Sequence, residues 1–181
     1  MTDDPSLKNP DTRNIINYLK YWSDFEINEF LDQKRHSFGV LCCNFAGDFN
    51  LATVIRNNNA FLAKEVFIYG KKKWDRRGSV GAHHYSHIRH LPSEKDLDEI
   101  KDYVWVGIDN IDGIAVPMDS YVWPKNSLLC FGEEHHGLPP EVIKRCKDIV
   151  YIRQFGSVRS LNVGSAAAIA MYDYTNKIVP E

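Results

Sequence analysis

Short apolar runs alternate with segments of helical periodicity along most of the chain. The run FGVLCCNF at 38–45 is followed by Gly47, which favours a strand buried on both faces. The next segment, 50–63, has helical spacing, because its mostly apolar spaced positions share one face. These positions are Leu51, Val54, Ile55, Asn58 and Leu62. The pattern therefore predicts a strand followed by a helix.

The same alternation continues toward the C-terminus. Further apolar runs predict strands at 66–70, 104–109, 127–132 and 148–153, with a possible short strand at 87–91. Helices are predicted for the polar segment 97–103, for 139–146, which Pro139 or Pro140 opens, and for the alanine-rich part of 160–174. This order is typical of an α/β fold with a mostly parallel sheet flanked by helices.

Size and composition favour one domain. The chain has 181 residues, of which 44% are hydrophobic and 25% charged, enough for a single sizeable core. We expect a helical lead-in at 1–37 and one domain at 38–181. The uncharged stretch 160–172 is too short to span a bilayer, and the acidic N-terminus is unlike a targeting peptide. A cytoplasmic protein without a membrane partner is expected.

The cysteines do not indicate a disulfide framework or a metal site. Cys42 and Cys43 are neighbours, and Cys130 and Cys146 stand apart, with no C-x-x-C pair. We expect reduced thiols that fill apolar space.

Charge is distributed unevenly. The net charge is −2, yet the segment 71–90 has six Lys or Arg against one Asp, together with four histidines. The segment 94–102 then has five acidic residues against two lysines. A basic segment therefore lies within an acidic protein, so the net charge does not exclude a polyanionic partner.

Polar clusters follow three of the predicted strands. They are NFAGDFN before the helix at 50–63, FGEEHHGLPPE after the strand at 127–132, and IRQFGSVRSLN before the alanine-rich helix. Each alone fits a polar loop or a helix N-cap. Ligands of parallel sheets bind beyond the carboxyl ends of the strands, so three such loops favour a shared pocket.

These three clusters also carry a resemblance. FNLATVIRNNNAF, LLCFGEEHHGLPPE and IRQFGSVRSLNVGSAAAIAMYDY resemble, in order and spacing, the three motifs of the SpoU/TrmH branch of the SPOUT RNA methyltransferases. The resemblance spans roughly 38–174. It implies a methyltransferase domain with a deep C-terminal trefoil knot, which binds S-adenosylmethionine and releases S-adenosylhomocysteine without a metal. It also implies a homodimer in which both subunits build each active site.

The resemblance implies a set of site residues. The catalytic candidates match the family motifs one by one, and they are Asn50, Arg56, Glu134, Ser160 and Asn162. The cofactor is expected to rest against backbone near Ile108, Gly132, Ile152, Ser160 and Leu161.

The implied reaction transfers a methyl group to a ribose 2′-hydroxyl of tRNA or rRNA. We assign Arg56 to the phosphate beside the ribose, because an arginine does not ordinarily lose its proton to act as a base. Asn50, Ser160 and Asn162 are expected to orient Arg56 and the ribose. Glu134 is expected to hold Arg56 or a loop amide.

The chain departs from the family pattern in two ways. Arg153, followed by Gln154, stands where members often have a proline. Only about 37 residues precede the first predicted strand, so substrate recognition is expected to rely on the core.

The basic segment is the candidate RNA contact. We expect Lys71, Lys72, Lys73, Arg76 and Arg77 to contact phosphates, and Trp74 and Tyr85 to stack on bases. A solvated loop is the alternative. His83, His84, His87 and His90 could suggest a metal site, but no Cys and few acids stand beside them, so none is expected.

Other functions compete with ribose methylation. The chain could bind the cofactor and RNA without catalysis, or methylate a base, as more distant SPOUT proteins do. A dinucleotide-binding oxidoreductase would need G-x-G-x-x-G after the first strand, which FAGDFN does not supply.

Overall fold

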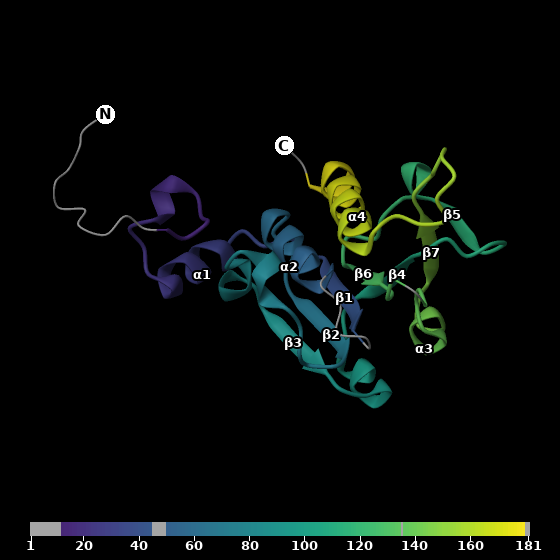
Figure 1. Cartoon of the computed structure of the whole chain (residues 1–181), viewed down its shortest axis with the longest axis horizontal. Helices are drawn as coiled ribbons and strands as arrows, with labels where there is room; N and C mark the ends of the chain where they lie inside the picture. The colour runs from purple at the N-terminus through teal and green to yellow at the C-terminus, as the bar shows by residue number, and fades with distance from the viewer. Residues whose placement is uncertain (1–11, 45–49, 135, 180–181) are drawn as a thin grey trace.

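A single seven-stranded sheet organises the molecule. The computed structural model describes residues 12–44, 50–134 and 136–179, and its strands follow the order β3-β2-β1-β6-β4-β7-β5 (Figure 1). The strands are β1 (Gly39–Asn44), β2 (Val66–Gly70), β3 (Ile88–Leu91), β4 (Val104–Ile108), β5 (Ala115–Pro117), β6 (Ser127–Phe131) and β7 (Asp148–Tyr151). The helices are α1 (Asp24–Asp32), α2 (Asn50–Ala60), α3 (Pro140–Ile143) and α4 (Val163–Ile178).

Every pairing between neighbouring strands is parallel. β1 lies between β2 and β6, with Val40 opposite Val66 on one side and Leu129 on the other. β4 pairs with β6 and β7, and β5 adds to the outer edge of β7. The predicted α/β class with a mostly parallel sheet is confirmed. The carboxyl ends of all these strands consequently lie along one side of the sheet, its carboxyl edge.

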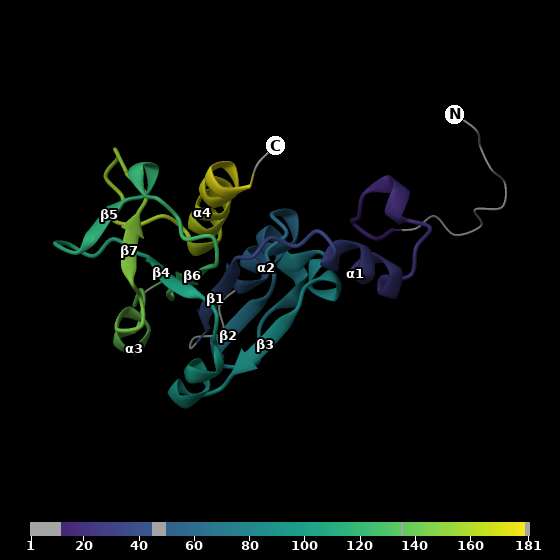
Figure 2. The same ribbon diagram turned by 180° about the vertical axis from the view of Figure 1, so that it is seen from behind.

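Alternate side chains of each strand build a core on both faces of the sheet. Val40 and Cys42 face α2 and α4, whereas Leu41 and Cys43 face the opposite layer, to which α3 contributes. Figure 1 and Figure 2 show α2 beside α4, with α3 on the other side of the strands. Six buried residues of β1 explain its continuous apolar run, because a central strand has no solvent face.

Helix α4 packs closely against α2, as its small residues allow. A Cβ on Gly164 would lie 2.7 Å from Cγ2 of Thr53, and the Asn57 side chain donates to the Gly164 carbonyl over 2.9 Å. Ala167 and Ala170 are fully buried in the same layer. The alanine-rich segment therefore serves close backbone approach within the chain. The trefoil knot stays a prediction.

One expected helix was wrong and one strand was missed between residues 94 and 117. A 3₁₀ helix occupies Glu94–Glu99 in place of a helix at 97–103, because Ser93 and Asp96 form a reciprocal cap three residues earlier. Asp102 then has a φ of +69°, which ends any helical path. The edge strand β5 was not predicted, since its three residues are too few for a periodic signal.

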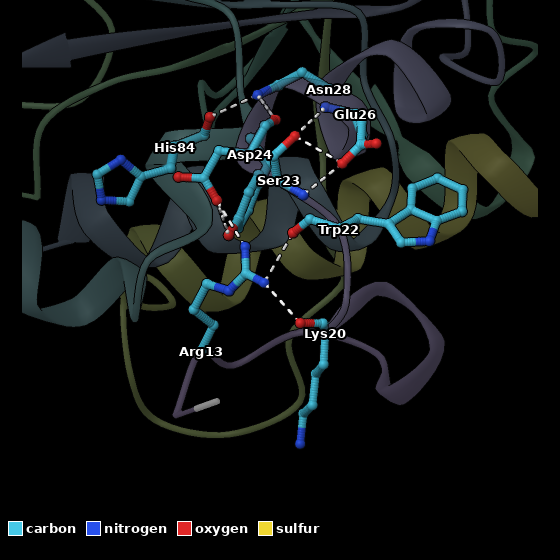
Figure 3. A network of polar contacts seen from close by, with 9 residues as sticks. Arg13, Lys20, Trp22, Ser23, Asp24, Glu26, Asn28 and His84 are labelled. Atoms are coloured by element: carbon cyan, nitrogen blue, oxygen red, sulfur yellow. Dashed lines mark hydrogen bonds and ion pairs between the residues drawn. The ribbon is translucent and has the colours of Figure 1, made fainter. Parts of the chain in front are cut away.

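The N-terminal segment packs against the end of the molecule opposite β5 (Figure 1). The Arg13 guanidinium donates to the Asp24 carboxylate and to the carbonyls of Lys20 and Trp22 (Figure 3). Asn28 of α1 donates to the His84 carbonyl over 3.1 Å. The segment is thereby tied to the 3₁₀ turn that carries the histidines.

The four cysteines are free. Burial raises the pKa of the Cys42 thiol far above its ordinary value, so this sulfur is an apolar filler. Within the described residues, no helix is both long and apolar enough to cross a bilayer.

Candidate functional site

A cavity of about 830 Å³ opens where β6, β4 and β7 end side by side. Its walls come from the loops after these three strands and from the start of α4. All five residues expected near the cofactor line it, namely Ile108, Gly132, Ile152, Ser160 and Leu161. Loops separated by up to 53 positions in the sequence meet here because parallel strands end at one edge.

Glycines shape the wall that follows β6. The Glu133 and Gly137 backbones exchange two hydrogen bonds, of 3.1 and 2.9 Å, which close a tight loop. A Cβ on Gly132 would lie 2.0 Å from the Gly137 carbonyl carbon, so only glycine fits there. Gly137 has a φ of +66°, which a glycine adopts without strain. The G-x-E-x-x-G pattern is thus a steric requirement of this loop.

Asp109 joins the ends of β4 and β6, and the sequence reasoning missed it. Its Oδ2 accepts from the Leu138 N–H over 2.9 Å, and its Oδ1 accepts from the Asn110 N–H over 2.8 Å. All three residues line the cavity. The available signal was an aspartate directly after a buried strand, the same signal that marked the other three polar clusters.

Three of the expected catalytic residues form a continuous hydrogen-bonded chain. Asn162 donates through Nδ2 to the Asn50 Oδ1 over 2.7 Å. Asn50 in turn donates through its Nδ2 to the Glu134 Oε2 over 2.9 Å. These residues come from α4, α2 and the loop after β6, so the chain joins all three motifs. Glu134 also lines the cavity, which places the chain at its rim.

Asn162 has a second task at the start of α4. Its Oδ1 accepts from the Gly164 N–H and the Ser165 N–H, so it is the N-cap of the helix. The N-cap interpretation of this polar cluster is therefore correct for Asn162, while its amide N–H remains available to Asn50. Ser160 is exposed on the cavity wall.

Arg56 lies apart from the hydrogen-bonded residues Asn162, Asn50 and Glu134. It projects from α2 as an exposed residue and is not among those that line the cavity. Asn162 donates to Asn50 and Asn50 donates to Glu134, and within the described residues no hydrogen bond or ion pair joins these three to Arg56. Their expected role in orienting Arg56 stays a prediction.

The basic segment begins at the edge of the sheet where the cavity lies. Lys71 follows directly after β2, and Lys71–Lys73 are exposed. Asn44 is fully buried at the end of β1, where its side chain donates to the carbonyls of Lys71 and Lys73 and its backbone carbonyl accepts from the Lys71 N–H. A buried side chain thus fixes the path of the lysines.

The remaining basic residues have partners of their own. The Arg76 guanidinium lies 5.8 Å from the Trp74 ring centre, and Arg77 forms an ion pair of 2.5 Å with Asp75. That pairing lowers the pKa of Asp75 to about 2, through hydrogen bonds from the Arg77 side chain and backbone. Trp74 is only half-buried and Arg76 is exposed, so the expected stacking of a base on Trp74 stays a prediction.

Tyr85 cannot stack on a base, contrary to the expectation. It is 5% exposed and packs with Leu19 and Ile27, while its hydroxyl donates to Asp24 over 2.9 Å. The N-terminal segment covers this ring, which the sequence pattern did not indicate. Half of the expected aromatic pair is therefore structural.

The histidines face separate partners. His83 Nδ1 lies 2.7 Å from the Ser79 hydroxyl, His87 pairs with Asp32 over 2.8 Å, and His90 lies 2.6 Å from the Gly70 carbonyl. Across residues 12–44, 50–134 and 136–179, no three His, Cys, Asp or Glu side chains gather in a metal-binding group.

Comparisons with known proteins agree with this arrangement. The sequence profile of the SpoU rRNA Methylase family matches residues 37–172. The 23S rRNA (guanosine-2′-O-)-methyltransferase of Acinetobacter baylyi is 32% identical over 95 residues, which cover 51% of this chain and 38% of that protein. The tRNA (guanosine(18)-2′-O)-methyltransferase of Saccharomyces cerevisiae is 30% identical over 97 residues, or 48% of this chain and 7% of that protein. The chain therefore spans less than two thirds of these relatives.

Solved structures show the same fold. The TrmH/SpoU tRNA modifying enzyme of A. aeolicus superposes with a TM-score of 0.74 at 22% identity, covering 85% of this chain and 81% of that one. The AdoMet-bound rRNA methyltransferase of Sinorhizobium meliloti superposes with a TM-score of 0.71 at 20% identity, covering 85% and 61%. With a family profile that matches most of its length and the three motifs joined at one cavity, the chain belongs to the SpoU rRNA methylase family.

Proposed function

We propose that this protein transfers a methyl group from S-adenosylmethionine to a ribose 2′-hydroxyl of RNA. The observation that carries the proposal is the hydrogen-bonded chain from Asn162 through Asn50 to Glu134 at the rim of the cavity. Relatives that share the family are named as 2′-O-methyltransferases of tRNA and rRNA. Either class of RNA is a candidate substrate.

The cavity fits S-adenosylmethionine in size and chemistry. Its volume of about 830 Å³ lies in the range of small-molecule sites, which is roughly 300–1,000 Å³. Glu133 and Glu134 on its wall suit a ligand that carries a sulfonium and an ammonium group. Gln154 adds a buried acceptor without a partner among the described residues. We propose that this cavity holds the cofactor and then S-adenosylhomocysteine, and that no metal takes part.

The protein's own task is positioning and charge stabilisation. The bound cofactor supplies a methyl group already activated by positive sulfur. Arg56 holds a phosphate beside the target ribose, and its permanent charge lowers the pKa of the 2′-hydroxyl nearby. The hydrogen bonds from Asn162 to Asn50 and from Asn50 to Glu134 fix the loop of Glu134 against the start of α4. The cavity and the ribose thereby keep their relative position.

A second copy of the chain is part of this proposal. Arg56 is outside the lining of its own chain's cavity, so we assign it to the cavity of the partner subunit. Exposed apolar residues near the cavity and on α4 support a paired surface. Among them Phe155 is 94% exposed, Val158 63% and Tyr172 59%. The C-terminal knot belongs to the same proposal and rests on family membership.

The composite site can be tested by complementation. Arg56→Ala and Asn162→Ala chains are co-expressed with different affinity tags, and the doubly tagged dimer is isolated. If Arg56 serves the partner's cavity, one of the two sites in this dimer holds both mutations and the other holds none, so about half of the wild-type activity returns. If each chain is self-sufficient, neither site is intact and activity stays lost. Analytical ultracentrifugation that finds only monomer at micromolar concentration would exclude the arrangement.

The RNA is proposed to approach along the carboxyl edge of the sheet. Lys71–Lys73 follow the carboxyl end of β2, on the side of the sheet where the cavity opens. β1 and the hydrogen-bonded Asn50 lie between the lysines and the cavity. Phosphates bound by these lysines would extend along the edge toward the cavity. Trp74 and Arg76 add a surface on which an unpaired base can stack.

One experiment separates the candidate functions. The protein is incubated with S-adenosylmethionine labelled in the methyl group and with unmodified RNA, which is then hydrolysed in alkali. A methylated 2′-oxygen cannot attack the neighbouring phosphate, so ribose methylation leaves the label in alkali-resistant dinucleotides. Label in mononucleotides would assign the reaction to a base instead. No label, with cofactor binding measured, would leave a missing partner protein or noncatalytic RNA binding as the explanation.

A further inference from the structure

In the segment directly after β7, successive side chains point in opposite directions. Ile152 and Gln154 line the cavity. Arg153 between them lies on the outside and forms an ion pair, with 3.3 Å between its Nε and the Asp119 Oδ2. Arg153 stands at the position where family members often have a proline. Both side chains of the ion pair are more than half exposed, so the departure at Arg153 lies outside the cavity wall that Ile152 and Gln154 line.

Gln154 contains a polar atom that the described residues leave unsatisfied. Its Oε1 is buried and has no hydrogen-bond partner among them. Buried side-chain acceptors nearly always have a partner, so an orphan on a ligand-cavity wall points to a bound donor. Gln154 lines the cavity, and its side chain ends in a soft torsion, so the amide can adjust to a donor bound there.

The surroundings of Gln154 indicate which part of a ligand it meets. Ile152, Ile111 and Ile108 line the same cavity from the ends of β7 and β4. The acidic residues Glu133 and Glu134 come from the end of β6, and β4 separates β6 from β7 in the sheet. Two strand spacings place these groups about 10 Å apart. The cavity thus has two glutamates at the end of β6 for cationic groups, and at the end of β7 an uncharged stretch with Ile152 and Gln154 for a flat ring. Asp109, at the end of β4 between them, accepts from the N–H groups of Asn110 and Leu138.

We propose that Gln154 binds the 6-amino edge of the cofactor's adenine and makes the cavity selective for it. This inference rests on the proposed function, because it assigns the cavity to S-adenosylmethionine. A glutamine amide is a good reader of adenine, since its oxygen accepts from the 6-amino group while its nitrogen donates to N7. The apolar neighbours provide the faces against which the ring packs. Gln154 lies within the stretch that resembles the third motif, but it is not among the site residues that the resemblance implies.

The test measures binding and requires no turnover. Dissociation constants are determined by isothermal titration calorimetry for S-adenosylhomocysteine and for its analogue with hydrogen in place of the 6-amino group. The wild-type chain is expected to prefer the natural compound. Gln154→Met, which keeps the length of the side chain without its polar atoms, is expected to lower this preference about five- to tenfold, the effect of one hydrogen bond. The preference is a ratio within one variant, so a general loss of folded protein cancels.

Two further variants complete the design. Gln154→Glu keeps an acceptor of the same shape and is expected to retain the preference for the 6-amino group. Arg153→Gln, one position away and outside the cavity, should also leave the preference at the wild-type value. An unchanged preference in Gln154→Met would overturn the role of Gln154 and leave the methyltransferase proposal intact. Wild-type protein that fails to bind S-adenosylhomocysteine would overturn both.

Discussion

Asn162 combines two interactions that substitution can separate. Its Oδ1 caps α4, and its Nδ2 donates to Asn50 over 2.7 Å. Asn162→Ser retains an N-cap acceptor but is too short to reach Asn50, whereas Asn162→Ala removes both interactions. Comparing the two variants therefore isolates the cap from the link between the motifs.

The expected losses follow from the two contacts. Replacing an N-cap residue by alanine costs about 1 kcal/mol, within a range of roughly 0.5–2. A side-chain hydrogen bond contributes about 1 kcal/mol net. For a chain of 181 residues, 1 kcal/mol corresponds to about 2–4 °C in Tm. We expect Asn162→Ser to melt about 2–4 °C below the wild type and Asn162→Ala about 4–8 °C below it.

Calorimetric melting and urea titration measure these shifts, and Asn50→Ala closes a double-mutant cycle with Asn162→Ser. The coupling free energy should be about 1 kcal/mol, because each substitution removes the same hydrogen bond. Both Asn162 variants should lose methyl transfer, since both separate the motifs. Equal melting of the serine and alanine variants would refute the capping argument. A coupling near zero would show that the bond to Asn50 contributes nothing.

Four further predictions concern other parts of the molecule. Arg56→Ala should leave S-adenosylhomocysteine affinity unchanged in calorimetry and lower methyl transfer by about 100-fold or more; unchanged turnover would overturn its assignment. Gly132→Ala should weaken that affinity at least about tenfold, because the added Cβ meets the Gly137 backbone at 2.0 Å; normal affinity would show that the loop adjusts. Replacing Lys71–Lys73 by glutamine should weaken RNA binding in a filter assay and flatten its log–log salt dependence by about 2–3. Matched control lysines, expected to have little effect, precede β4, β6 and β7 at the opposite edge of the sheet: Lys101, Lys125 and Lys147. Burial, with the charges of His84 and Arg76, lowers the pKa of His83 from its ordinary 6.5, so the unfolded chain takes up a proton before the folded chain does. Stability should therefore fall as the pH drops below about 6.5, and His83→Asn should lose less Tm between pH 7.5 and 5.5; an equal loss would refute this cause.

Strong local patterns predicted the elements that lie in the centre of the fold. The apolar run at β1, all six residues of which are buried, and the spaced apolar positions of α2 each fit few backbone conformations. The failures occurred where few residues carry the signal. β5 has three residues, and the 3₁₀ helix at Glu94–Glu99 depends on one reciprocal cap between Ser93 and Asp96.

The sequence predicted those parts of the candidate site in which a glycine or a polar residue stands close behind a predicted strand. The glycines of the loop after β6 and the polar residues before α4 stand directly after strands, so the parallel-sheet rule brings them together. Asp109 satisfied the same rule and was overlooked. Gln154 could not have been predicted, because its significance depends on a buried oxygen that has no partner among the residues the structure describes. Tyr85 failed as a stacking residue because a separate segment covers it.

The sequence by itself determined the α/β class, the succession of the main strands and helices along the chain and the three motifs, because these depend on local periodicity and on residue types. Only the tertiary structure decided that Asn162 bonds to Asn50 and Asn50 to Glu134, that Arg56 stays outside the cavity, and that Gln154 lines it. The physical reason is distance along the chain. Asn50 and Asn162 are 112 positions apart, and a hydrogen bond between them exists only after the sheet has brought their strands' ends to one edge.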